Sequence, residues 1–167
     1  ILSIEKAKSV REIKATIFKN LKSFFLIFSE SWMSDSMLKK TSPDLIINCA
    51  GITKRRGVKD NIQNTRLLNS DIPHKLDSWA NLNSKKLIHF STDCVFSGAR
   101  GNYLDDDITD ADDTYGKTKA AGEVNSFNTL TIRCSMIGRE LYNFTELFEW
   151  LVKNKNKNID GYSRVFY

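Results

Sequence analysis

A hydroxyl, a phenol and an ammonium occur in this chain at a spacing that suits the reduction of a carbonyl group. Thr92 follows the apolar run 87–90, and Tyr115 and Lys119 come later, four positions apart. Residues four apart share one face of a helix. An ammonium beside a phenol favours the phenolate and lowers the phenol's pKa. Tyr115 could then give a proton to a carbonyl oxygen that accepts a hydrogen bond from Thr92.

Two predicted elements position these groups. The run 87–90 predicts a buried parallel strand that ends in the polar residues 91–93. Ligands of open α/β sheets bind beyond the carboxyl ends of the strands, so Thr92 lies where a substrate oxygen can reach it. Residues 112–114 are good capping residues for a helix predicted over 114–125, which carries the phenol and the ammonium.

The spacing of Tyr115 and Lys119 has an ordinary alternative. A tyrosine and a lysine four apart are common on helices, where both side chains usually face solvent. Two features favour a site: the strand that ends in Ser-Thr-Asp ahead of the pair, and the small residues 120–122 behind it, which allow close helix packing.

Four stretches of the chain resemble extended short-chain dehydrogenases/reductases, and among these the dTDP-4-dehydrorhamnose reductase-like group of nucleotide-sugar reductases. They are STDCVFSG (91–98), GNYLDDD (101–107), YGKTKAAGE (115–123) and TIRCSMIGRE (131–140). PDLIINCAG (43–51) fits the same group as a strand that ends in a small-residue turn beside the cofactor. LLNSDIPHKL (67–76) fits as a helix that carries an asparagine near the active site.

The resemblance implies an α/β fold with a Rossmann-like, doubly wound parallel sheet in a single NAD(P)-binding domain over residues 1–167. Residues 41–167 correspond to the family's catalytic core, and residues 1–40 are atypical. No Gly-x-x-Gly-x-x-Gly turn occurs near the start, since the first glycine is Gly51. We therefore expect an incomplete sheet, with the first βαβ unit and the C-terminal substrate lobe missing or altered. A chain truncated at both ends is the simplest interpretation, and a degenerate homologue is the alternative.

The resemblance also implies a reaction: NADPH or NADH reduces the 4-keto group of a nucleotide-linked deoxysugar, in the synthesis of cell-surface polysaccharide precursors. Tyr115 is the implied catalytic acid. Lys119 lowers the pKa of Tyr115 and holds the nicotinamide ribose, and Thr92 orients the carbonyl.

Further site residues follow from the resemblance. The cofactor-binding positions, besides Tyr115 and Lys119, are Cys49, Ala50, Gly51, Asn69 and Ser91. The substrate-binding positions are Thr92, Asp93, Val95 and Phe96. Asn69 is expected to support the lysine through the helix backbone or a water molecule.

Composition narrows the class of partner. The net charge is +5, which suits a phosphate-bearing cofactor and substrate, and the scattered lysines lack the aromatic stacking pattern of a nucleic-acid site. The basic residues 54–56 are expected in a solvated loop rather than at a phosphate. The apolar run 24–28 is too short to span a membrane, so no membrane partner is expected. Cysteines predicted to be reduced favour a cytoplasmic protein. A homodimer is the assembly considered.

A metal site is not expected. Cys49, Cys94 and Cys134 are far apart without Cys-x-x-Cys spacing, and the chain has two histidines. The cysteines are predicted to be reduced, buried thiols, and His89 a satisfied core residue. The acidic stretch 105–113 lacks the glycine and terminal glutamate of a calcium loop and is expected to be a solvated loop and helix cap.

Hydrophobic periodicity gives the remaining elements. Strands are predicted over 45–49, 87–91, 130–134 and 161–167, with 24–28 a core strand or helix edge. Helices are predicted over 5–22, 34–40, 114–125 and 140–153, with a helical segment over 58–68 and 73–81 that Pro73 breaks or starts. Strands that alternate with helices favour a parallel sheet.

Three hypotheses on function stay open. The first is the nucleotide-sugar reductase. The second is a non-catalytic reductase-like subunit or an inactive fragment, which the missing glycine-rich turn favours. The third is an epimerase or dehydratase of the same extended group with tightly held NAD. The stretches 91–98 and 101–107 favour the reductase over the third hypothesis.

Overall fold

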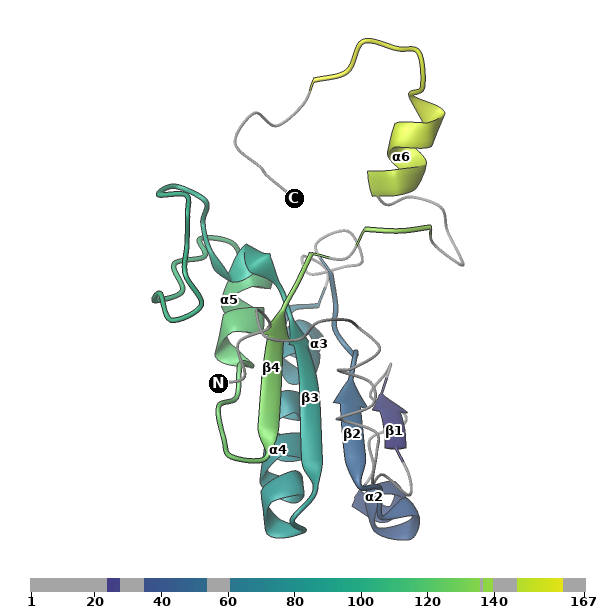
Figure 1. Cartoon of the computed structure of the whole chain (residues 1–167), viewed down its shortest axis with the longest axis vertical. Helices are drawn as coiled ribbons and strands as arrows, with labels where there is room; N and C mark the ends of the chain where they lie inside the picture. The colour runs from purple at the N-terminus through teal and green to yellow at the C-terminus, as the bar shows by residue number, and fades with distance from the viewer. Residues whose placement is uncertain (1–23, 28–34, 54–60, 136, 140–146, 161–167) are drawn as a thin grey trace, which may run out of the picture.

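Four parallel strands form the sheet of this protein, seen here in a computed structural model (Figure 1). The structure describes residues 24–27, 35–53, 61–135, 137–139 and 147–160. The strands are β1 (Phe24–Ile27), β2 (Leu45–Asn48), β3 (Lys86–Ser91) and β4 (Thr129–Arg133). They pair in the order β1-β2-β3-β4, each parallel to its neighbour.

Helical segments connect successive strands. They are α2 (Asp35–Thr41) before β2; α3 (Ile62–Arg66), the π-helix η3 (Leu67–Asp71) and α4 (Ile72–Leu82) before β3; the 3-10 turn η4 (Asp93–Val95) and α5 (Thr114–Ala121) before β4; and α6 (Leu147–Lys153) after it. All three crossovers advance in the same direction across the sheet. Because parallel crossovers are right-handed, their helices lie on one face. Figure 1 shows α3, α4 and α5 together behind the sheet.

The hydrophobic core lies between that face and the helices. Its buried members are Leu38, Ile46, Ala50, Ile72, Leu76, Ala80, Leu87 and Val124. On the opposite face Ile47 and Ile88 are half-buried, and Leu130 is 46% exposed. None of the described helices covers this second face, so the observed sheet is one wing of a doubly wound fold.

Most predicted elements are confirmed. The strands predicted over 45–49, 87–91 and 130–134 are β2 to β4 within one residue, and the helix predicted over 34–40 is α2. Of the two alternatives left open for 24–28, a core strand or a helix edge, the structure shows a strand, β1. The helix predicted over 114–125 ends earlier, at Ala121, with Gly122 as its C-cap. The predictions for 5–22, 54–56, 140–146 and 161–167 lie outside the described residues.

The helical segment around Pro73 is continuous from Ile62 to Leu82, so Pro73 does not break it. The chain passes from α3 through the π-helix η3 into α4. Pro73 falls in the first turn of α4, where its missing N–H would not have closed a bond within that helix. Among the described residues, no helix is long and apolar enough to cross a membrane.

Two glycines let α5 approach its neighbours closely. A Cβ on Gly116 would lie 2.2 Å from the backbone oxygen of Cys94 in η4. A Cβ on Gly122 would lie 1.9 Å from the backbone oxygen of Asn69 in η3. The small residues at 120–122 therefore do allow close helix packing, and the glycine is the member that the contact requires.

We predict that Gly122→Ala lowers the free energy of unfolding by about 2 kcal/mol or more, because the new methyl group overlaps the η3 backbone. The φ of Gly122 is −93°, which alanine adopts readily, so the loss isolates the contact. Gly138→Ala is the matched control: no atom of the described residues lies within 4 Å of the position of its Cβ, and we expect a change below about 0.5 kcal/mol. Equal urea-unfolding curves for the two variants would contradict this packing.

His89 lies in the core on β3 with no exposed surface. The side-chain oxygen of Asn48 accepts from the N–H of Ala50 (3.1 Å), so its amide nitrogen faces His89 and donates to Nδ1 (3.1 Å). Within the described part of the chain, His89 Nε2 has no hydrogen-bond partner. The core position is as predicted, but only one of the two ring nitrogens is satisfied. Burial, together with the positive charge of Lys119, lowers the pKa of His89 to about 3.

The buried neutral imidazole predicts a stability that depends on pH. Below pH 6.5 the unfolded chain protonates His89 while the folded chain does not, until the pH nears 3. In that window His89 makes the free energy of unfolding decrease as the pH is lowered, by up to about 1.4 kcal/mol per pH unit. Urea unfolding at several pH values should give a shallower dependence for His89→Leu than for the parent. Parallel dependences would show that His89 is not held neutral.

Candidate functional site

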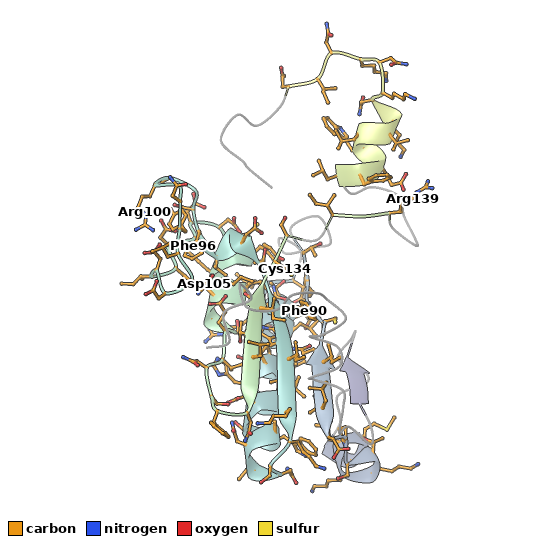
Figure 2. The ribbon with its side chains drawn as sticks, in the orientation of Figure 1. Phe90, Phe96, Arg100, Asp105, Cys134 and Arg139 are labelled. Atoms are coloured by element: carbon orange, nitrogen blue, oxygen red, sulfur yellow. The ribbon has the colours of Figure 1, made fainter. Side chains whose placement is uncertain are left out.

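The carboxyl ends of β2, β3 and β4 gather the candidate residues at one edge of the sheet. Figure 2 shows Phe90 and Cys134 near the ends of β3 and β4. The loop that carries Phe96, Arg100 and Asp105 lies beside them. This is the edge at which open α/β sheets bind their ligands.

Lys119 is the central charge of the site. Its side chain comes from α5, is 4% exposed, and donates from Nζ to the backbone oxygen of Phe90 (2.7 Å). Burial lowers the pKa of Lys119 to about 8, and the carboxylate of Glu123 opposes that shift. The amine is therefore mostly charged at neutral pH, which the proposed role beside a phenol requires.

Tyr115 lies in the first turn of α5 and is half-buried. Asp113 caps this turn, because its Oδ1 accepts from the N–H of Gly116 (2.9 Å). The prediction of a cap within 112–114 is confirmed. Since Gly116 packs on the backbone of Cys94, the first turn of α5 lies against η4, directly after Thr92. The phenol and the hydroxyl thus come from segments that touch.

Thr92 is buried between β3 and η4. Its Oγ1 accepts from the N–H of Cys94 (3.2 Å) and donates to Oδ1 of the exposed Asp93 (3.1 Å). The bond from Cys94 fixes the position of the hydroxyl oxygen, and the hydroxyl proton is donated to Asp93. A substrate oxygen would therefore replace Asp93 as the acceptor.

Asn69 ties the turn after β2 to the helices. Its Oδ1 accepts from the N–H of Ile52 (2.8 Å), and its Nδ2 donates to the oxygen of Ile52 (3.0 Å) and to Oγ1 of Thr118 (3.2 Å). A Cβ on Gly51 would lie 3.3 Å from Asn69 Oδ1 and 3.9 Å from Lys119 Nζ. Gly51, Asn69 and Lys119, three of the predicted cofactor-binding residues, therefore lie close together.

Three other predicted site residues, Ser91, Val95 and Phe96, are buried or contact neighbouring side chains. Ser91 is buried and donates from Oγ to Oε1 of Glu123 (2.7 Å). Val95 is fully buried. Phe96 stacks on Tyr103, with ring centroids 4.4 Å apart, and has the guanidinium of Arg133 4.9 Å from its centroid.

The cysteines differ from the prediction. All three are free thiols, as expected, but Cys49 is exposed, and Cys94 and Cys134 are only half-buried. The reason is position: β2 ends at Asn48, so Cys49 already belongs to the turn at the sheet edge. Ala50, the next residue, is buried.

Two residues at this edge, Glu123 and Arg133, are not predicted from the sequence. Arg133 donates from Nε to Oε1 of Glu123 (2.9 Å) and from Nη2 to Oε2 (2.7 Å), a two-pronged ion pair that is mostly buried. One signal is available in the sequence, because Glu123 follows Lys119 at the same spacing of four that separates Lys119 from Tyr115.

Known proteins match both the sequence and the fold. A dTDP-4-dehydrorhamnose reductase of Shigella flexneri is 36% identical over 87 residues, which are 52% of this chain and 29% of that protein. Methionine adenosyltransferase 2 subunit beta of Bos taurus is 28% identical over 134 residues, 74% of this chain and 40% of that protein. A hypothetical dTDP-4-dehydrorhamnose reductase from Sulfolobus tokodaii superposes with a TM-score of 0.64 at 27% identity, over 74% of this chain and 45% of that one.

These matches confirm the resemblance found in the sequence and the Rossmann-like α/β fold. The chain spans less than a third of the length of the Shigella flexneri relative. The family match itself extends over residues 27–158, which include every strand beyond β1 and all the candidate site residues. The chain belongs to the RmlD substrate binding domain family.

Proposed function

We propose that this chain carries the proton-delivery site of an NAD(P)H-dependent reductase of the short-chain dehydrogenase type, which acts on the 4-keto group of a nucleotide-linked deoxysugar. The observation that carries the proposal is the buried, charged Lys119, one helical turn from Tyr115, on a helix whose first turn packs beside Thr92. Reductases of such sugars are among its relatives. The product would serve the synthesis of cell-surface polysaccharide precursors in the cytoplasm, where free thiols persist.

The residues at the sheet edge fit the nicotinamide end of the cofactor. Gly51 leaves the space beside Lys119 and Asn69 open, and the Asn69 bonds hold the backbone of Ile52 in place. When bound, NAD(P)H would supply the hydride. Lys119 is the residue that would hold its ribose, and Cys49 and Ala50 continue the same turn.

Side chains of the protein would donate a proton to the substrate oxygen and stabilise its developing negative charge. Tyr115 gives its phenolic proton to that oxygen, and the ammonium of Lys119 stabilises the phenolate that remains. Thr92 exchanges its bond to Asp93 for a bond to the oxygen, which steadies the negative charge that develops there. Phe96, at the base of the adjoining loop, would contact the sugar.

A second candidate function has an observation of its own. The Bos taurus relative, which matches 74% of this chain, is by name a subunit, methionine adenosyltransferase 2 subunit beta. A non-catalytic subunit would keep the fold without needing the proton-delivery residues. The reductase is preferred because Lys119 is kept buried and charged, an arrangement that stability alone does not favour.

We predict that Tyr115→Phe lowers kcat about a hundredfold or more, because the variant has no phenolic proton to donate. The test follows oxidation of NADPH by the purified chain with a dTDP-linked 4-keto-6-deoxysugar. The unfolding free energy of the variant, measured in parallel, should stay close to that of the parent. An unchanged rate in the variant would contradict the assignment. A parent chain that binds NADPH without turnover would favour the non-catalytic subunit.

A further inference from the structure

Glu123 lies directly after Gly122, the C-cap of α5. It follows Lys119 at the spacing that separates Lys119 from Tyr115. Its N–H donates to the oxygen of Ala120 (3.1 Å), which holds it against the last turn of the helix.

The carboxylate of Glu123 joins two strands to the helix. Ser91 at the end of β3 donates to its Oε1, and Arg133 at the end of β4 binds both of its oxygens. Lys119, one turn earlier, holds Phe90 of β3 through the backbone. Phe90 and Ser91, the last two residues of β3 before Thr92, are thus held by Lys119 on α5 and by Glu123 just past its C-cap.

The same carboxylate is the main negative group that acts on Lys119. Other groups of the described chain that act on the ammonium are His89 on β3, Cys49 after β2 and Cys134 after β4. The cation Arg133 on β4 faces the same carboxylate and pairs with it. The imidazole is neutral. Partial loss of solvent contact at the sheet edge raises the pKa of both thiols above the ordinary 9.0, so they are protonated at neutral pH. Glu123 is therefore the anion that opposes the lowering of the Lys119 pKa by burial.

We propose that Glu123 is a positioning residue of the site, which fixes α5 on the ends of β3 and β4 and keeps the buried Lys119 in its charged form. The proposal rests on the proposed reductase function, in which Lys119 acts as an ammonium. Without Glu123, a large part of the amine would be neutral at physiological pH, and the phenolate of Tyr115 would lose its support. Arg133 and Ser91 serve the site by orienting this carboxylate.

The test is the titration of Lys119, observed by NMR in the full chain labelled with carbon-13 at the lysine side chains. Loss of a signal in Lys119→Arg assigns the resonance. In the parent we expect a pKa of about 8, and in Glu123→Gln a pKa lower by about one unit, because the nearby anion is gone. Loosened packing alone would move the pKa the other way, towards the 10.5 of an exposed lysine. An unchanged or raised pKa in Glu123→Gln overturns the proposal.

Two further variants sharpen the result. Glu149→Gln is the matched control, because Glu149 also pairs with an arginine, Arg139, but is not among the groups that act on Lys119. It should leave the Lys119 titration unchanged. If Glu123→Gln fails to fold with Arg133 unpaired, the double variant Glu123→Gln/Arg133→Gln removes both partners and should still lower the pKa of Lys119.

The titration needs neither cofactor nor turnover, so it separates this proposal from the proposed function. A lowered pKa in an inactive chain would support the role of Glu123 and count against the reductase. In an active chain the alkaline limb of the pH–rate profile should shift to lower pH in Glu123→Gln, since Lys119 loses its proton earlier. An active chain whose profile and Lys119 titration both stay in place would overturn the role of Glu123 alone.

Discussion

The hydrogen bond from the buried ammonium of Lys119 to the backbone oxygen of Phe90 is the interaction on which the candidate site depends. An amine taken out of water is stable as a cation only with polar and charged partners, and here the strand supplies one of them. The bond joins α5 to β3 just before Thr92. It therefore fixes both the place of the charge and the position of α5, the helix that carries Tyr115, at the sheet edge.

Close packing makes this bond geometrically feasible. Gly116 and Gly122 bring α5 against the backbones of η4 and η3, and Asn69 joins η3 to the turn after β2. The ends of β2, β3 and β4 are therefore connected through α5 and through Glu123, which follows it. The parallel strands serve the same end, because the loop that follows each strand starts at the carboxyl edge of the sheet.

Local spacing predicted much of this arrangement. The strand before Thr92, the cap at Asp113 and the shared face of Tyr115 and Lys119 each depend on residues close in sequence. The ion pair between Glu123 and Arg133 depends on how α5 and β4 meet, which no local pattern encodes. The π-helix around Asn69 and the exposure of Cys49 likewise follow from tertiary packing and from where β2 ends.

Calorimetric titration with NADPH of the purified chain and of Lys119→Met tests the central claim most directly, namely that the sheet edge around Lys119 receives a nicotinamide cofactor. We expect saturable binding to the parent chain and binding about tenfold weaker, or lost, in the variant. The same titration with NADH would show which cofactor is preferred. Equal binding by parent and variant, or no binding to a folded parent chain at millimolar NADPH, would contradict that claim.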